Sequence, residues 1–343
     1  MSRPRVGFLG TGWIGRHRMA AIAGGGAVEI AAIADPSEDC VREALATAPG
    51  AAVLPSLARL LEAELDGLVI ATPSALHAEQ AIAALDRGIA VFCQKPLGRN
   101  AAEAQAVVDA ARRADRLLGV DFCYRRTAAA KALAELVASG ELGEIFAGDL
   151  VFHNAYGPDK PWFYDRAQAG GGCLMDLGVH LADLALWLSD FPAVEQVASR
   201  LFAGGRPLPA DPQEVEDYAV ARFDLATGAS MQLACSWRLN AGQDARIEAS
   251  FYGTRGGATL RNVGGSFYDF ELLHHRGTAS ETLVAPPDEW GGRTAAAWAE
   301  RLARDRSFDA DAARLVEVSA LIDRIYAAHE GAGSAAARET ETV

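Results

Sequence analysis

Short apolar runs alternate with longer amphipathic, alanine-rich runs through roughly the first third of the chain. The apolar runs predict strands at residues 5–9, 28–34, 51–54, 67–70, 90–93 and 118–122. The amphipathic runs predict helices at residues 12–23, 37–48, 76–87 and 101–114. Strands that are apolar throughout and separated by helices form parallel sheets covered on both faces. This region therefore predicts an α/β domain with a doubly wound parallel sheet.

The pattern changes after about residue 125. A helix is predicted at 128–139 and a strand at 144–152, and a glycine-rich turn at 170–172 precedes a helix at 174–188. Alternating strands then follow, including 219–225, 230–237 and 246–252, and the tight connection 226–228 indicates an antiparallel hairpin. Two terminal helices are predicted at 294–303 and 310–328. The second half is therefore expected to be an α+β domain on a large, mostly antiparallel sheet.

A chain of 343 residues exceeds the usual size of a single hydrophobic core. We predict two domains, one at 1–123 and one at 124–330. The small, polar segment 331–343 is predicted to be a disordered tail.

The formal net charge of −13 disfavours a nucleic-acid partner, because an acidic surface repels phosphate backbones. Five cysteines without a C-x-x-C pair argue against a disulfide framework. The N-terminus runs directly into a predicted strand, and we see no apolar run of the length that a membrane helix needs. These features predict a cytoplasmic protein without a membrane partner.

A glycine-rich motif lies between the first predicted strand and the first predicted helix. It reads G-x-G-x-x-G and consists of Gly10, Thr11, Gly12, Trp13, Ile14 and Gly15. The first glycine permits a tight turn, the second lets backbone amides approach a pyrophosphate, and the third lets helix and strand pack closely. In this context the motif predicts a dinucleotide site at the positive end of the helix.

The second strand ends at Asp35, at the interval expected after such a motif. A carboxylate at this place accepts hydrogen bonds from the adenosine ribose and repels a 2′-phosphate. The next residues, Pro36 and Ser37, include no arginine that would favour NADP. Asp35-Pro36 is also an ordinary turn at a strand end. We predict NAD as the cofactor and NADP as the less favoured one.

Two further strand ends add candidate cofactor contacts. Thr72, Pro73, Ser74 and His77 follow the fourth strand and also begin a helix, so capping and ligand contact are both consistent with them. Gln94 and Lys95 follow the fifth strand. Repulsion from a positively charged nicotinamide and partial burial would favour the neutral form of Lys95, which suits proton transfer or polarisation of a substrate oxygen. A solvated surface lysine is the alternative.

Asp176 and His180 stand four residues apart on the predicted helix 174–188, so they share one face. This arrangement suits a histidine acting as acid and base beside an aspartate that positions hydroxyls. A buried structural histidine bonded to aspartate is the alternative. A zinc site from Cys173, Asp176, His180 and His153 is a minor alternative, since no ligand pair has a convincing zinc spacing. We therefore predict no metal.

These motifs together resemble the glucose–fructose oxidoreductase / inositol dehydrogenase (Gfo/Idh/MocA) family. The resemblance rests on the glycine motif, Ala71-Thr72-Pro73 with His77, the Lys95-Pro96 pair, and the glycine run before Asp176 and His180. It implies that 1–123 is a dinucleotide-binding Rossmann domain and that 124–330 is a substrate-binding and oligomerisation domain, whose open-faced sheet builds homodimers or homotetramers. It also implies Lys95 and His180 at the reacting carbon, with Asp176 nearby. One departure is Gln94, where the family usually has glutamate.

The expected reaction is hydride transfer between nicotinamide and a secondary hydroxyl or ketone of a sugar, sugar derivative or cyclitol. His180 would take the hydroxyl proton, Lys95 would stabilise the alkoxide, and Asp176 would fix the substrate. Candidate substrate contacts in the second domain are Tyr124, Arg125, His153, Asn154, Trp162, Asp176, His180 and Trp237. Two alternatives remain open, an NAD-dependent glycosidase and a non-catalytic dinucleotide-binding regulator. Retention of Lys95, Asp176 and His180 argues against the regulator.

Overall fold

The computed structural model describes residues 3–209 and 212–340, with side chains for 3–209 and 212–331. The chain forms two compact units. The first comprises Met1–Cys123 and Gly291–Val316, and the second comprises Tyr124–Trp290 and Glu317–Val343. The first division of the chain lies between residues 123 and 124, where we placed the domain boundary.

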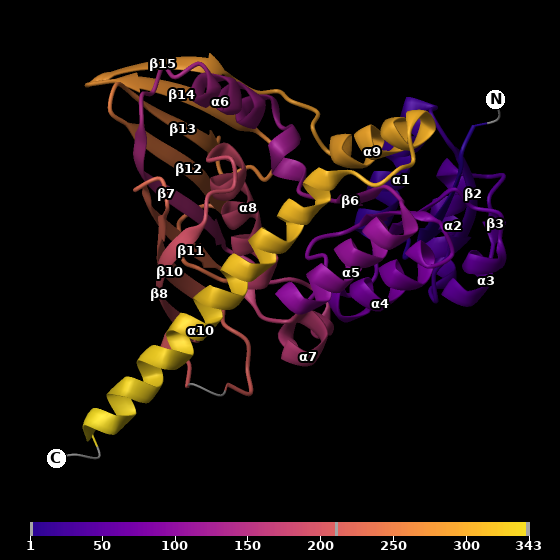
Figure 1. The fold of residues 1–343 in the computed structure, drawn as a ribbon, viewed down its shortest axis with the longest axis horizontal. Coiled ribbons are helices and arrows are strands. Elements are labelled where there is room, and N and C mark those ends of the chain that lie inside the picture. Colours follow the sequence, from indigo (N-terminus) through magenta and orange to yellow (C-terminus); the bar gives the residue numbers. More distant parts are fainter. Residues whose placement is uncertain (1–2, 210–211, 341–343) are drawn as a thin grey trace. The chain divides into compact units, whose positions relative to one another are not determined.

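The first unit contains a six-stranded parallel sheet with helices packed against it (Figure 1). Its strands are β1 (Arg5–Leu9), β2 (Glu29–Ala34), β3 (Ala52–Val53), β4 (Gly67–Ile70), β5 (Ala90–Cys93) and β6 (Leu118–Val120). Its helices are α1 (Trp13–Gly25), α2 (Glu38–Thr47), α3 (Leu57–Glu62), α4 (Ser74–Leu85), α5 (Ala101–Ala114), α9 (Arg293–Arg304) and the 3-10 turn η4 (Ala310–Ala313). The strand order β3-β2-β1-β4-β5-β6 is that of a Rossmann fold, which confirms the predicted fold of this region.

Helix α9 corrects our domain assignment, because we placed residues 291–316 in the second domain. Its buried residues Ala295, Trp298, Ala299 and Leu302 recur at helical spacing. The Trp298 ring lies 5.7 Å from the Phe92 ring of β5, between their centroids. A Cβ atom on Gly67 or Gly119 would lie 2.7 or 2.9 Å from that indole, so the two glycines make room for it. The apolar face of α9 therefore completes the core of the first unit.

The second unit is built on a nine-stranded sheet of order β15-β14-β13-β12-β7-β11-β10-β8-β9. Its strands are β7 (Ile145–Asn154), β8 (Val194–Ala203), β9 (Arg206–Pro207), β10 (Tyr218–Leu225), β11 (Ser230–Ser236), β12 (Ala245–Gly253), β13 (Gly257–Asn262), β14 (Phe270–Arg276) and β15 (Ala279–Val284). Among the described strands of this sheet, β7 and β11 form the one parallel pair. The large, mostly antiparallel sheet and the β10–β11 hairpin are confirmed.

Helices of the second unit pack beside this sheet and connect its strands. They are η1 (Cys123–Arg126, at the boundary), α6 (Ala128–Ala138), η2 (Pro161–Tyr164), α7 (Arg166–Ala169), η3 (Leu174–Gly178), α8 (Val179–Leu188) and α10 (Arg314–Thr340, which begins in the first unit). The helix predicted at 174–188 is thus divided into a π-helical turn, η3, and the α-helix α8. Helix α10 continues to Thr340, which corrects the predicted disordered tail for 331–340; residues 341–343 lie outside the described residues.

The stretch Arg166–Leu188 is long and apolar enough to cross a membrane by length and composition, which our inspection of the sequence missed. In the structure, 89% of its most apolar window is buried. The apolar residues of α8, among them Leu181, Leu184 and Leu188, are part of the second unit's core. The core helix of a folded domain is commonly apolar on all sides, and burial in the second unit accounts for the composition of α8.

Candidate active site

The glycine motif forms a turn between β1 and α1. Gly10 has a φ of +86°, and a Cβ atom there would lie 2.5 Å from the carbonyl oxygen of Ala71. A Cβ atom on Gly15 would lie 2.3 Å from the carbonyl oxygen of Gly10. At Gly12 the added atom would meet no described atom within 4 Å. Two glycines therefore permit close backbone packing, while the middle one leaves the turn open to a ligand.

Helix α1 begins directly behind this turn. Gly12 is its N-cap, and no described side chain caps the first-turn amides. Backbone amides at such a helix end suit a phosphate group, both as donors and through the helix dipole. Trp13 is 60% exposed beside them, and Ile14 is half-buried. The open turn and the uncapped amides fit a dinucleotide pyrophosphate.

Asp35, at the end of β2, fastens this turn to the neighbouring strand. Its Oδ2 accepts a hydrogen bond from the Thr11 amide at 2.6 Å, and its Oδ1 accepts one from the Ser37 amide at 2.8 Å. The carboxylate is half-buried, so it stays accessible at the edge of the turn. A carboxylate oxygen has lone pairs for more than one donor, which leaves Asp35 able to bind a ribose hydroxyl as well.

The strand end after β4 is held by side chains rather than left open. The Thr72 hydroxyl donates to Gln80 Oε1 at 2.6 Å. The ring nitrogens of His77 lie 2.7 Å from the carbonyl oxygens of Thr72 and Pro96. Burial lowers the pKa of His77, against the two carbonyl acceptors, which favour the protonated ring. His77 is 1% exposed and connects the loops after β4 and β5 through these contacts. Pro73 and Ser74 lie at the start of α4.

Gln94 belongs to a buried polar cluster that the sequence analysis did not find. Its Nε2 donates to Asp121 Oδ2 at 2.9 Å, and the same oxygen accepts from Arg18 Nε at 2.5 Å. Arg18 and Asp121 are 5% and 1% exposed. Asp121 follows β6, so an acidic residue at the end of an apolar strand was the signal that could have revealed it. The half-buried Lys95 follows Gln94 directly, and this cluster therefore anchors the segment that carries it.

In the second unit, Asp176 and His180 lie in η3 and α8. Asp176 is half-buried, and its Oδ2 accepts a hydrogen bond from the Trp237 indole at 3.1 Å. The His180 ring is 7% exposed and meets the Tyr124 ring edge-on, with centroids 4.9 Å apart. The structure thus brings each of these two polar residues against an aromatic side chain that we had predicted to contact substrate.

The other predicted substrate residues fall into two groups. Trp162 stacks on Phe163, with centroids 3.8 Å apart, and Phe163 meets Trp237 edge-on, which links Trp162 to the surroundings of Asp176. His153 lies 2.8 Å from the Ser236 hydroxyl through Nδ1, and burial lowers its pKa. Asn154 accepts a hydrogen bond from the Tyr156 amide at 2.7 Å. Ser236 and Trp237 are consecutive, so the end of β11 connects the two groups.

Arg125 has contacts of a different kind. Its guanidinium forms a two-point ion pair with Asp183, which is 1% exposed, and it lies over the rings of Trp187 and Phe191. Burial raises the pKa of Asp183, and the guanidinium opposes that rise. These contacts give Arg125 a structural role within the second unit.

No three or more His, Cys, Asp or Glu side chains in the described part of the chain are grouped to hold a metal ion. Cys173 instead lies beside Cys235, with sulfur atoms 3.9 Å apart, and both thiols are fully buried. Burial raises the pKa of Cys173 well above its usual value, which disfavours the thiolate that zinc requires.

Curated relatives match the chain over large parts of its length. A rhizopine catabolism protein of Rhizobium meliloti is 32% identical over 76% of this chain and 79% of its own. A putative UDP-kanosamine synthase oxidoreductase subunit of Amycolatopsis mediterranei is 34% identical over 75% of each chain. D-glucoside 3-dehydrogenase of Escherichia coli is 31% identical over 59% of this chain. The chain spans 61% of the length of that enzyme, and 58% and 53% of the lengths of two other curated relatives.

Solved structures show the same fold. Levoglucosan dehydrogenase in complex with NADH and levoglucosan is 22% identical, with a TM-score of 0.81 over 96% of this chain and 97% of its own. A 3-ketoreductase from Actinomadura kijaniata in complex with NADP gives a TM-score of 0.82 at 22% identity, over 95% and 98% of the two chains.

Two family models cover most of the chain. Residues 4–122 match an oxidoreductase family with an NAD-binding Rossmann fold, which confirms the predicted NAD cofactor. Residues 130–259 match the GFO/IDH/MocA C-terminal domain. The resemblance stated from the sequence is therefore confirmed, and the chain belongs to the Gfo/Idh/MocA family of oxidoreductases.

Proposed function

We propose that the protein is an NAD-dependent dehydrogenase or reductase that acts on a secondary hydroxyl or ketone of a sugar, sugar derivative or cyclitol. Relatives named as D-glucoside 3-dehydrogenase, levoglucosan dehydrogenase and inositol 2-dehydrogenase support this substrate class. Each of those names refers to a ring that carries several hydroxyl groups.

The residues of the first unit fit the cofactor. The open turn at Gly12 and the amides of α1 would bind its pyrophosphate, and Asp35 would accept hydrogen bonds from the adenosine ribose and disfavour a 2′-phosphate. The bound nicotinamide supplies the hydride acceptor or donor. The protein's own contribution is to orient the substrate and to move the hydroxyl proton.

Three side chains act on the substrate in this proposal. His180 takes the proton of the substrate hydroxyl during oxidation and returns it during reduction. Lys95 donates a hydrogen bond to the same oxygen and stabilises its developing negative charge. Asp176 accepts a hydrogen bond from a neighbouring substrate hydroxyl and so fixes the ring. The observation that carries the proposal is the placement of Asp176 in a π-helical turn, bonded to Trp237, one turn before His180.

A spectrophotometric screen tests this function. The protein is incubated with NAD or NADP and a panel of sugars, inositols and glycosides, and formation of reduced nicotinamide is followed. We expect reduction of NAD with at least one cyclic polyol and weaker use of NADP. Glycoside cleavage without net NADH would assign the glycosidase function instead, and tight NAD binding without turnover of any compound would assign the regulator.

We further propose that the protein is cytoplasmic and self-associates through the sheet of the second unit. The strand register places Val220 and Tyr252 on one face of that sheet, where they are 38% and 40% exposed. Exposed apolar side chains on a broad sheet favour association. Light scattering after size-exclusion chromatography tests this, with a dimer or tetramer expected and a monomer at micromolar concentration as the contrary result.

A further inference from the structure

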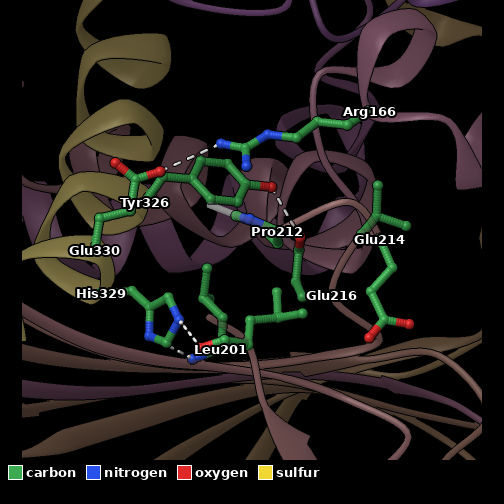
Figure 2. Close-up of a pocket in the computed structure, with 10 residues that line it drawn as sticks. Arg166, Leu201, Pro212, Glu214, Glu216, Tyr326, His329 and Glu330 are labelled. Atoms are coloured by element: carbon green, nitrogen blue, oxygen red, sulfur yellow. Dashed lines mark hydrogen bonds and ion pairs between the residues drawn. The ribbon is translucent and has the colours of Figure 1, made fainter. Parts of the chain in front are cut away.

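A buried carboxylate lies directly behind the glycine run that precedes Asp176. Glu216 is 2% exposed and comes just before β10. Its Oε1 accepts hydrogen bonds from the amides of Gly172 and Leu174, each at 2.9 Å, and from the Tyr326 hydroxyl at 2.8 Å. Figure 2 shows the Tyr326 hydroxyl of α10 directed at this carboxylate. One oxygen atom thus joins the glycine run to α10.

The backbone of the same residue completes the contact. The carbonyl oxygen of Glu216 accepts from the Cys173 amide at 3.0 Å, so three consecutive amides, residues 172–174, are bound by one residue. These amides begin the π-helical turn η3, and the carbonyl of Gly172 in turn accepts from the Asp176 amide at 3.0 Å. The position of the Asp176 backbone therefore depends on Glu216 through a single intervening hydrogen bond.

The neighbouring residue holds the other side of Asp176. The carbonyl oxygen of Asp217 accepts from the Trp237 amide at 2.8 Å, and the Trp237 indole donates to the Asp176 carboxylate at 3.1 Å. Residues 216 and 217 therefore fix both the turn that carries Asp176 and the indole that binds its side chain.

The glycine run is explained by the closeness of this packing. A Cβ atom on Gly171 would lie 1.9 Å from the Tyr326 hydroxyl oxygen, and one on Gly172 would lie 2.0 Å from the carbonyl oxygen of Glu216. A side chain at either position would have to displace Glu216 or Tyr326. The run therefore lets the chain approach the Glu216–Tyr326 pair.

A half-exposed ion pair lies beside Tyr326. Arg166 forms an ion pair with Glu330 at 3.4 Å, drawn as a dashed line in Figure 2, and the Arg166 guanidinium lies over the Tyr326 ring. Burial raises the pKa of Glu216, while its backbone and hydroxyl donors oppose the rise. Donors converging on one buried carboxylate restrict its rotamer, and they restrict the segments that supply the donors as well.

We infer that Glu216 and Tyr326 are positioning residues for catalysis, which hold the turn η3 so that Asp176 and His180 are presented to substrate in a fixed geometry. This inference rests on the proposed function of those two residues. Neither Glu216 nor Tyr326 acts on the substrate itself. Their effect passes through the amides of residues 172–174 and through Trp237.

Two variants test the inference. Glu216→Gln keeps the size of the side chain and one acceptor oxygen but removes the charge, so the hydrogen bonds that it accepts from the amides of residues 172 and 174 become weaker. Tyr326→Phe removes only the hydroxyl, so it remains informative if the first variant does not fold. Glu330→Gln is the matched control, because it alters a half-exposed ion pair in the same region without touching the amides of residues 172–174. For each protein we measure kcat, KM, the Kd for NAD, and amide hydrogen exchange.

We expect kcat to fall about 10–100-fold in Glu216→Gln and less in Tyr326→Phe, as for a small displacement of reacting groups. The Kd for NAD should stay within about twofold, because the glycine turn lies in the first unit. Exchange of amides 172–176 should rise in both variants and stay at the wild-type rate in Glu330→Gln. Unchanged exchange, or faster exchange with wild-type kcat, would overturn the inference. If the wild-type protein oxidises no substrate, the proposed function fails, and the exchange measurement still decides whether the pair holds the turn.

Discussion

Replacing Gln94 by glutamate introduces a second carboxylate into the buried cluster of the first unit. Gln94 Nε2 lies 2.9 Å from Asp121 Oδ2, which also accepts from Arg18 Nε at 2.5 Å. Gln94 and Asp121 are 7% and 1% exposed. In Gln94→Glu an oxygen takes the place of the donating nitrogen, so a hydrogen bond is lost and two carboxylates face each other.

The cost follows from these distances. Two unit charges about 3 Å apart repel by about 6 kcal/mol at an effective dielectric constant of about 20. Protonation limits this penalty, because an ordinary carboxyl group with a pKa near 4 takes up a proton at pH 7 at a cost of about 4 kcal/mol. Arg18 offsets part of the repulsion. We expect Gln94→Glu to lower the free energy of unfolding by about 3 kcal/mol at pH 7, and by less at pH 5, where protonation costs less.

Urea unfolding at pH 5 and pH 7 measures this effect. Gln105→Glu is the matched control, because Gln105 Nε2 also lies 2.9 Å from a carboxylate, that of Asp109, which pairs with Arg112. That site is exposed on α5, so the control should cost no more than about 0.5 kcal/mol. The double variant Gln94→Glu/Asp121→Asn should recover stability relative to either single change. Additive losses in the double variant, or equal losses at the buried and exposed sites, would refute the reasoning.

Three further predictions concern the first unit. Gly10→Ala should cost about 1–3 kcal/mol of stability in thermal unfolding, because Gly10 has a positive φ and lies close to Ala71. Gly12→Ala should leave stability within about 0.5 kcal/mol but weaken NAD binding, measured by fluorescence titration. Equal losses of stability in the two variants would contradict this prediction. Asp35→Ser should weaken NAD binding about tenfold and raise the ratio of NADP to NAD affinity; an unchanged ratio in the same titration would show that Asp35 does not select the cofactor. The lowered pKa of His77 means that the native state keeps the ring neutral while the unfolded chain takes up a proton below pH 6.5. Stability from His77 is therefore present above pH 6.5 and is lost as the pH falls. In urea unfolding between pH 5 and 8, the free energy of unfolding of His77→Gln should fall less at the acid end than that of the wild-type protein. An identical fall in both proteins would contradict this prediction.

Much of the fold was readable because local pattern and tertiary role agree. The run from Val6 to Leu9 is apolar because these residues of β1 are buried, and Gly10 and Gly15 are glycines because neighbouring backbone leaves no room for a Cβ atom. Helix α9 was assigned to the wrong domain, because an amphipathic helix shows in its sequence that it has an apolar face but not which core that face joins.

The residues of the candidate site, too, could be predicted only in part. The motif residues before and after the strands of the first unit could be named from spacing, because the carboxyl ends of parallel strands meet at one edge of the sheet. Glu216 and Tyr326 could not be found in this way. They lie 44 and 154 residues or so from the turn that they hold, and a single glutamate before a strand has no local signal of burial. Long-range hydrogen bonds of this kind become visible only in three dimensions.

The most direct test of the proposed function is a comparison of Lys95→Ala and His180→Ala with the wild-type protein on a substrate found in the screen. If these side chains stabilise the substrate oxygen and move its proton, each substitution should reduce kcat by about 10²–10⁴-fold while the Kd for NAD stays within about twofold. Wild-type kcat in either variant would contradict the proposed roles of Lys95 and His180.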